Sequence, residues 1–280
     1  MQTSMHLQKN LSSFAGWLGK EGKSRGTIEK YLRDLRAFSE WLDGCELTNE
    51  TAIKWREHLL SNGYAPVTVN SMLAAINAYC RFAKVDICVK FVKIQRKLFR
   101  EQSKELTREE YRRLVETAYS KGNERLALLM ETICASGIRV SEVPYITVEA
   151  ARNGKAVISL KGKVRTIMLP GKLCRKLLKY AKKQKIASGE IFLTKSGKSL
   201  SRRQIWAEMK RLCKAAGVET SKVFPHNLRH LFATTFYRIY KDIAHLADVL
   251  GHSSIDTTRI YLVTTGQEHQ KQLERLGLLV

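Results

Sequence analysis

Arginine, histidine and tyrosine recur in three short motifs of this chain, and side chains of these types can act together on a phosphate group. The motifs contain Arg139, then His226 and Arg229, then His252 and Tyr261. The guanidinium group of arginine grips two phosphate oxygens and does not deprotonate. A phenol, with an ordinary pKa of about 10, becomes an oxygen nucleophile when nearby positive charge helps it to ionise. Cleavage of a phosphodiester also requires a proton for the leaving oxygen.

The spacing within the motifs supports a shared site. His226 and Arg229 are three residues apart, which places both on one face of a helix. The segments 135–142, 225–230 and 250–261 resemble the motifs of the tyrosine recombinases, the phage-type integrase family. The resemblance covers most of the chain and is strongest in its second part.

This resemblance implies a role for each motif residue. Arg139 and Arg229 would clamp the phosphate, and Tyr261 would attack it. His252 would donate a hydrogen bond to the phosphate. His226 would either bond the phosphate or take the proton from Tyr261.

Members of the family also carry a catalytic lysine in the turn of a β-hairpin, where it protonates the leaving oxygen. Lys161 fits that position best, and Lys163 is the alternative because the turn is short. Arg165 is expected to contact a backbone phosphate. Glu142, one helical turn after Arg139, either orients an active-site group or is an exposed helix carboxylate.

Two departures from the family pattern, Asn227 and Leu231, leave the catalytic positions untouched. His226 and His230 are four residues apart, a spacing that zinc sites also use. A metalloprotease would have glutamate where Asn227 stands, and the sequence offers no evident third ligand. The expected chemistry therefore uses no metal and no cofactor, because a tyrosine–phosphate bond conserves the energy of the bond that is broken.

The charge of the chain indicates a polyanionic partner. Lysine and arginine number 49 against 26 acidic residues, a net charge of +23, which repels itself unless an anion is bound. DNA and RNA are the first candidates, and an aromatic-rich strand motif that would stack RNA bases is missing. No apolar run reaches the roughly 18 residues of a membrane span, so a membrane partner is not expected. Six scattered cysteines and the lack of a signal peptide favour reduced thiols in the cytoplasm.

The first part of the chain, residues 1–85, is predicted to be a bundle of four helices. Thr27 is expected to cap the second of them. In the resembling family this bundle is the SAM-like core-binding domain, which binds DNA. The apolar residues recur at helical spacing in segments 7–18, 28–42, 53–60 and 69–82.

The second part, residues 107–280, is expected to be the catalytic domain. A basic linker, residues 86–106, precedes it, with Lys90 and Lys93 near one helical face. The catalytic domain begins with a capping box at 107–110 and is otherwise mainly α-helical.

Short apolar runs at 157–160 and 166–169 predict a β-hairpin. A further short strand is possible at 190–193. The predicted fold class is therefore mainly α, with a small hairpin in an α+β catalytic domain.

Further residues are expected to contact DNA because they are basic or polar and lie at helix starts, in the linker or in the hairpin. Phosphate contacts position a protein on DNA, whereas base contacts specify the site. The expected DNA-binding residues are Arg25, Thr27, Lys30, Tyr31, Thr68, Asn70, Lys90, Lys93, Lys163, Arg165, Arg202 and Arg203.

The interpretation that follows is a site-specific recombinase acting on double-stranded DNA through a 3′-phosphotyrosyl intermediate. Exchange between two cut sites implies a tetramer of protomers. A type IB topoisomerase would use similar groups, but the small helical first domain favours a recombinase. A catalytically silent DNA-binding protein would not need the complete set of candidate groups. A C-terminal helix over 267–279 is expected to dock either on its own protomer or on a neighbour.

Overall fold

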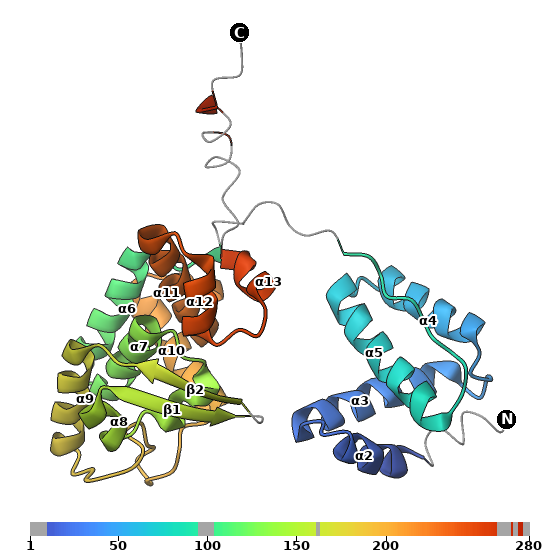
Figure 1. Cartoon of the computed structure of the whole chain (residues 1–280), viewed down its shortest axis with the longest axis horizontal. Helices are drawn as coiled ribbons and strands as arrows, with labels where there is room; N and C mark the ends of the chain where they lie inside the picture. The colour runs from blue at the N-terminus through green and yellow to red at the C-terminus, as the bar shows by residue number, and fades with distance from the viewer. Residues whose placement is uncertain (1–9, 95–103, 161–162, 262–269, 271–273, 277–280) are drawn as a thin grey trace. The chain divides into compact units, whose positions relative to one another are not determined.

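The chain divides into two compact units, residues 1–96 and 97–280, and each has a large hydrophobic core of its own (Figure 1). The computed structural model describes residues 10–94, 104–160, 163–261, 270 and 274–276. The expected C-terminal helix therefore falls mostly outside the described residues. Within the described parts, every helix is too short or too polar to cross a membrane.

In the first unit, the described residues 10–94 form a bundle of four helices, in agreement with the prediction. Its helices are α2 (Leu11–Lys20), α3 (Arg25–Leu42), α4 (Asn49–Ser61) and α5 (Pro66–Ala83). Aromatic side chains fill the core, with Phe14 and Phe38 fully buried. Ser24, and not Thr27, caps α3: its hydroxyl accepts a hydrogen bond from the Thr27 amide at 3.3 Å. Thr27 is the third helical residue, whose free N–H is the one that a capping side chain satisfies.

Two asparagines of α5 hold the chain that leaves this helix. The Asn77 amide donates to the Val89 carbonyl at 3.0 Å and accepts from the Val89 N–H at 2.9 Å. Asn70 makes the same pair of bonds with Val92, at 2.9 and 2.7 Å. Residues 85–94 consequently form no helix, so the predicted helical face with Lys90 and Lys93 is wrong.

The second unit is mainly α-helical with one hairpin, as predicted. Its elements are α6 (Arg108–Ser120), α7 (Glu124–Ser136), η2 (Val140–Tyr145), α8 (Val148–Asn153), β1 (Lys155–Leu160), β2 (Lys163–Met168), α9 (Gly171–Lys183), α10 (Arg202–Ala216), η3 (Thr220–Lys222), α11 (Pro225–Tyr240), α12 (Ile243–Leu250), α13 (Ile255–Thr258) and η4 (Arg259–Tyr261).

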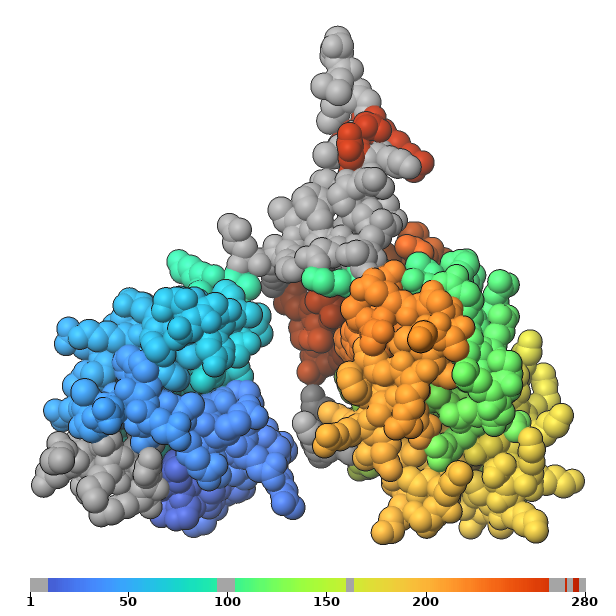
Figure 2. All heavy atoms as spheres, turned by 180° about the vertical axis from the view of Figure 1, so that it is seen from behind, coloured from blue at the N-terminus to red at the C-terminus, as the bar shows by residue number. Residues whose placement is uncertain are grey.

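Helix α7 is the centre of this unit. Its sequence is apolar on nearly every side, which is typical of a helix buried among others, and it packs against α6, α9, α10 and α11. Figure 2 shows the face of the unit on which α6 and α10 lie side by side. Arg139 follows directly after the C-terminus of α7, so the best-buried helix of the unit fixes its position.

The hairpin β1–β2 is antiparallel, with Lys155 opposite Met168 and Leu160 opposite Lys163. Ala156, Ile158 and Ile167 point into the core. Residues 190–193 take part only in isolated bridges, Thr147 with Glu190 and Leu193 with Ser199, so they do not form the possible strand.

Candidate active site

A glycine turn aims Arg139 at the site. Gly137 caps the C-terminus of α7 with a left-handed φ of 65°, a conformation that glycine adopts without steric cost. A Cβ at Gly137 would also lie 2.5 Å from the Phe232 ring. The chain then turns, and Arg139 stands before η2 in an extended conformation.

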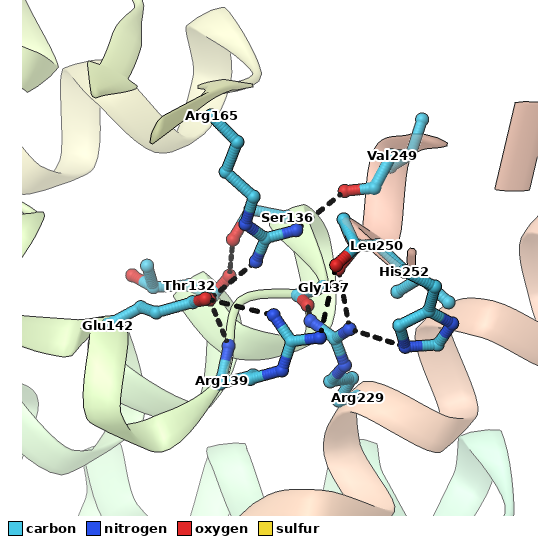
Figure 3. A network of polar contacts seen from close by, with 11 residues as sticks. Thr132, Ser136, Gly137, Arg139, Glu142, Arg165, Arg229, Val249, Leu250 and His252 are labelled. Carbon is cyan, nitrogen blue, oxygen red and sulfur yellow. Dashed lines mark hydrogen bonds and ion pairs between the residues drawn. The ribbon is translucent and has the colours of Figure 1, made fainter. Parts of the chain in front are cut away.

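Glu142 is buried and joins two arginines (Figure 3). Its carboxylate accepts from the Arg139 backbone N–H at 2.7 Å and from the Arg139 guanidinium at 3.1 Å. It also accepts from the Arg165 guanidinium at 2.6 Å. The alternative of an exposed helix carboxylate is therefore wrong. Breaking such a buried pair typically costs about 3–5 kcal/mol, because the remaining charge is stranded.

Arg165 is held by partners within the protein. Besides Glu142, its guanidinium donates to the Val249 carbonyl at 3.2 Å, and only 16% of its side chain is exposed. A Cβ at Gly251 would lie 2.5 Å from the Arg165 guanidinium, so this arginine packs against the bare backbone of the turn after α12. These bonds connect β2, Glu142 and the turn before His252. A backbone phosphate contact would compete with them, and the expected contact stays a prediction.

Arg229 lies on α11 and is almost completely buried. It donates to the carbonyls of Gly137 and Leu250, the latter at 2.8 Å, and to Nε2 of His252 at 3.1 Å (Figure 3). Burial, followed by the nearby charge of Arg139, lowers the pKa of Arg229 to about 10. The guanidinium therefore stays charged at neutral pH, and a bound anion would reduce the energetic cost of burying that charge.

His252 lies between Arg229 and the segment that carries Tyr261. Its Nδ1 is 2.8 Å from the Thr258 hydroxyl, and its ring is nearly parallel to the Tyr261 ring, with centroids 6.2 Å apart. Burial, with Arg229, Arg139 and other cations, lowers the pKa of His252 to about 4. The imidazole is therefore neutral at physiological pH.

Tyr261 ends η4 and is buried against Ala233, Leu246 and Leu250. The ring of His230 lies 5.1 Å from the Tyr261 ring, between centroids. The second histidine of the possible zinc pair thus contacts the candidate nucleophile. Within the described part of the chain, no three histidine, cysteine or acidic residues are grouped as metal ligands would be.

His226 occupies the first turn of α11, one turn before Arg229, and is exposed. Partial desolvation, Arg229 and Arg139 together lower its pKa, so its ring senses both arginines and is neutral at pH 7. The catalytic-lysine prediction is not tested: Lys161 lies outside the described residues, and so does the side chain of Lys163.

Arg139 and Arg165 border a cleft of about 430 Å³. Arg202, at the start of α10, lines the same cleft together with Arg139, Arg165 and His252. Arg203 is exposed in the same first turn of α10. Among the described residues that line the cleft, three arginines face the one carboxylate of Glu142. The cleft therefore carries excess positive charge and suits an anion.

The DNA-binding candidates of the first unit have varied surroundings. Arg25 is exposed and pairs with Glu29 at 2.8 Å. Lys30 bonds Asp34 and the Ser71 carbonyl. The expected contact of Asn70 would compete with its two bonds to the chain at Val92. Of the others, Thr68, Lys90 and Lys93 are exposed, while Thr27 and Tyr31 are partly buried.

Sequence reasoning missed the roles of Gly251 and Thr258. Gly251 lies next to His252, but nothing in the sequence shows that Arg165 packs on it. Thr258 precedes Tyr261 by three residues, a spacing that places both on one face of a short helix. That spacing is the one sequence signal that could have placed the Thr258 hydroxyl near the site, and it does not identify His252 as its partner.

The chain is similar in sequence to proteins of one known family. The model of the phage integrase family matches residues 104–268, and that of the phage integrase N-terminal SAM-like domain matches residues 11–85. Tyrosine recombinase XerA of Pyrococcus furiosus is 31% identical, over 96% of this chain and 94% of that protein.

Two solved structures have the same fold. The Tn1549 transposon integrase in complex with transposon right end DNA matches with a TM-score of 0.74 and 18% identity, covering 99% of this chain and 100% of that one. A lambda integrase tetramer bound to a Holliday junction matches with a TM-score of 0.69 and 19% identity, covering 91% of this chain and 76% of that one.

Proposed function

Because the chain belongs to the phage integrase family, we propose that it is a site-specific DNA recombinase whose nucleophile is Tyr261. The observation that carries the assignment is the cluster of arginines beside His252, whose ring stacks on that of Tyr261. Arg139 and Arg165 share the single carboxylate of Glu142, while Arg229 is buried against backbone carbonyls and His252. This arrangement suits an anion held next to the tyrosine. It fits a phosphodiester better than a neutral substrate.

In the proposed reaction, Arg139 and Arg229 bind the non-bridging oxygens of one DNA phosphate and stabilise the charge that grows there. Neutral His226 takes the phenolic proton of Tyr261 as its oxygen attacks phosphorus. The bond from phosphorus to the 5′ oxygen breaks, and the hairpin lysine, Lys161 or Lys163, protonates that oxygen. The products are a 3′-phosphotyrosyl bond and a free 5′ hydroxyl.

The number of phosphoester bonds does not change in this step, so no external energy source is consumed. Attack by the 5′ hydroxyl of a second DNA then reseals the strand and releases Tyr261. Two duplexes cut on both strands require four tyrosines, hence a tetramer on DNA. The solved lambda integrase tetramer, whose fold this chain shares, supports that assembly.

The test is covalent capture. The protein is incubated with nicked duplexes of randomised sequence, and DNA that stays bound in detergent is recovered and sequenced. We expect wild-type protein to enrich a defined site, and Tyr261→Phe to bind that site without a covalent product, because only the phenolic oxygen is missing. An adduct formed by Tyr261→Phe would place the nucleophile elsewhere.

A further inference from the structure

The hydrogen bonds of His252 define which ring nitrogen carries its proton. The guanidinium of Arg229 has only N–H donors, so Nε2 of His252, 3.1 Å away, must accept. In a neutral imidazole the other nitrogen then carries the proton. Nδ1 therefore donates to the fully buried Thr258 hydroxyl at 2.8 Å.

This state of the ring is wrong for a bound phosphodiester. Phosphate oxygens only accept hydrogen bonds. His252 borders the cleft, but its Nε2 carries a lone pair, directed at Arg229, and so has no proton to donate to a phosphate. When the phosphate takes over the donors of Arg229, Nε2 needs a proton to bond it. The ring can gain a second proton, or its one proton can move from Nδ1 to Nε2.

The surroundings of the ring oppose a second proton. Arg229 and His226 on α11, Arg139 before η2 and Arg165 on β2 all disfavour an imidazolium, and with burial they depress the pKa of His252. The acidic group of the site, Glu142, is already shared by Arg139 and Arg165. The single charge of a phosphodiester faces three arginines, which leaves neutral His252 the favoured form.

The partner at Nδ1 permits the other route. A hydroxyl group is both donor and acceptor, whereas a carboxylate partner would only accept. By turning its O–H, Thr258 can donate to Nδ1 across the same 2.8 Å. It also stands three residues before Tyr261 in the chain, so this bond holds the ring to the segment that carries the nucleophile.

We propose that Thr258 is a positioning residue whose hydroxyl reverses its hydrogen bond when a phosphodiester enters the cleft, which switches neutral His252 to the tautomer that presents Nε2–H to the phosphate. One proton leaves Nδ1 and one arrives at Nε2, through water, so the net charge is unchanged. The proposal rests on the proposed function, because it needs a phosphate beside His252.

The direct test is nitrogen NMR of histidine-labelled Tyr261→Phe protein, with the His252 signals assigned by their loss in a variant that also carries His252→Gln. The first probe is inorganic sulfate, whose oxygens only accept, and the second is the DNA site recovered by covalent capture. We expect a protonated Nδ1 in the free protein and a protonated Nε2 with either probe. Retention of the free-state tautomer, or protonation of both nitrogens, would overturn the proposal.

Cleavage by Thr258 variants separates the hydroxyl from the methyl group. Thr258→Val keeps the shape and leaves Nδ1 without a partner, a loss of about 1–3 kcal/mol for a buried polar group, equivalent to roughly 5- to 150-fold in single-turnover cleavage. Thr258→Ser keeps the hydroxyl and should cleave within a few-fold of wild type. Equal rates for Thr258→Val and wild type, or a Thr258→Ser rate below that of Thr258→Val, would contradict the proposal.

The pH profile gives a further readout that packing alone would not move. The wild type and His252→Gln are compared for a decrease in cleavage rate as pH rises. If His252 stays neutral, the wild type shows no such decrease beyond any that His252→Gln also shows. Such a fall would mean that an imidazolium is the active form. A different result tests the proposed function: it is contradicted if wild-type protein forms no covalent adduct. In that case the sulfate experiment still reports the tautomer of His252.

Discussion

The arginines of the site differ in the groups that neutralise their charge. Arg139 and Arg165 meet the carboxylate of Glu142, whereas Arg229 meets carbonyl groups and a neutral imidazole. Burial of a cation without a carboxylate is costly, and Arg229 is 2% exposed. A bound phosphate would offset that cost, so an anion would gain binding energy at Arg229, next to the proposed point of reaction.

We expect Arg139→Ala and Arg229→Ala each to slow cleavage far more than they weaken DNA binding. Charge on the phosphate oxygens is greatest in the transition state, and losing one such donor typically costs about 3 kcal/mol, or roughly 100- to 1,000-fold in rate. Single-turnover cleavage and equilibrium binding of the captured site measure the two effects. Arg139→Lys and Arg229→Lys keep the charge without the fork and separate the two contributions. Equal losses in rate and affinity would make these arginines ordinary phosphate contacts.

A second prediction concerns the contact between Gly251 and Arg165. Gly251→Ala adds a Cβ only 2.5 Å from the guanidinium at a φ of 62°, so Arg165 must leave Glu142. Gly154 is a matched control, since its φ is 66° and nothing lies within 4 Å of an added Cβ. Both variants should lose about 1–2 kcal/mol of stability to left-handed backbone strain, but only Gly251→Ala should also lose cleavage activity. Similar activity in the two folded variants, compared at matched fractions of folded protein, would show that the Arg165 contact does not matter.

At the scale of elements, the predictable parts of the fold are those that follow from local sequence. Apolar spacing predicted the four helices of the first unit, and two short β-branched runs predicted the hairpin. The motifs also predicted which arginines and histidines would meet, because family resemblance carries information about distant contacts. Arg139, Arg229 and His252 do lie together in one network.

The parts that could not be predicted depend on long-range partners. Residues 85–94 have helical spacing of basic side chains, but Asn70 and Asn77 bond the backbone of Val92 and Val89, and the segment forms no helix. Arg165 is basic and near the expected lysine, but Glu142 lies 23 residues earlier in the chain and comes to it only on folding. Neither partner has a local signal in the sequence.

The two asparagines should protect specific amides from hydrogen exchange. The N–H of Val89 donates to Asn77, and that of Val92 donates to Asn70. Asn77→Ala removes both of its bonds to Val89, about 1–3 kcal/mol in total, and should speed exchange at Val89 with a smaller effect at Val92. Asn70→Ala should do the reverse, so each variant is the control for the other. Unchanged exchange in both variants would mean that these bonds do not hold the segment.

For the molecule as a whole, the relevant quantity is the charge of +23. Such an excess attracts DNA of any sequence, through the release of ions condensed on the phosphates. It contributes affinity and speed of encounter, while the choice of site depends on base contacts. Net charge and local contacts can be separated, because neutralising any one arginine changes the net charge equally wherever that arginine lies.

Affinity for the captured DNA should therefore fall steeply with salt, and the slope should depend on which arginine is removed. The logarithm of the binding constant is expected to fall by about 0.9 per neutralised phosphate for each tenfold rise in salt. Arg202 lines the cleft, so Arg202→Gln should reduce the slope by about 1.

Arg112, which is 73% exposed and pairs with Glu116 at 3.6 Å, is the control, because Arg112→Gln lowers the net charge by the same amount away from the cleft residues. Titrations with Tyr261→Phe protein measure binding without cleavage. If the affinity of that protein did not change with salt, binding through the DNA phosphates would be contradicted. Equal slopes for the two arginine variants would attribute binding to net charge and not to the cleft.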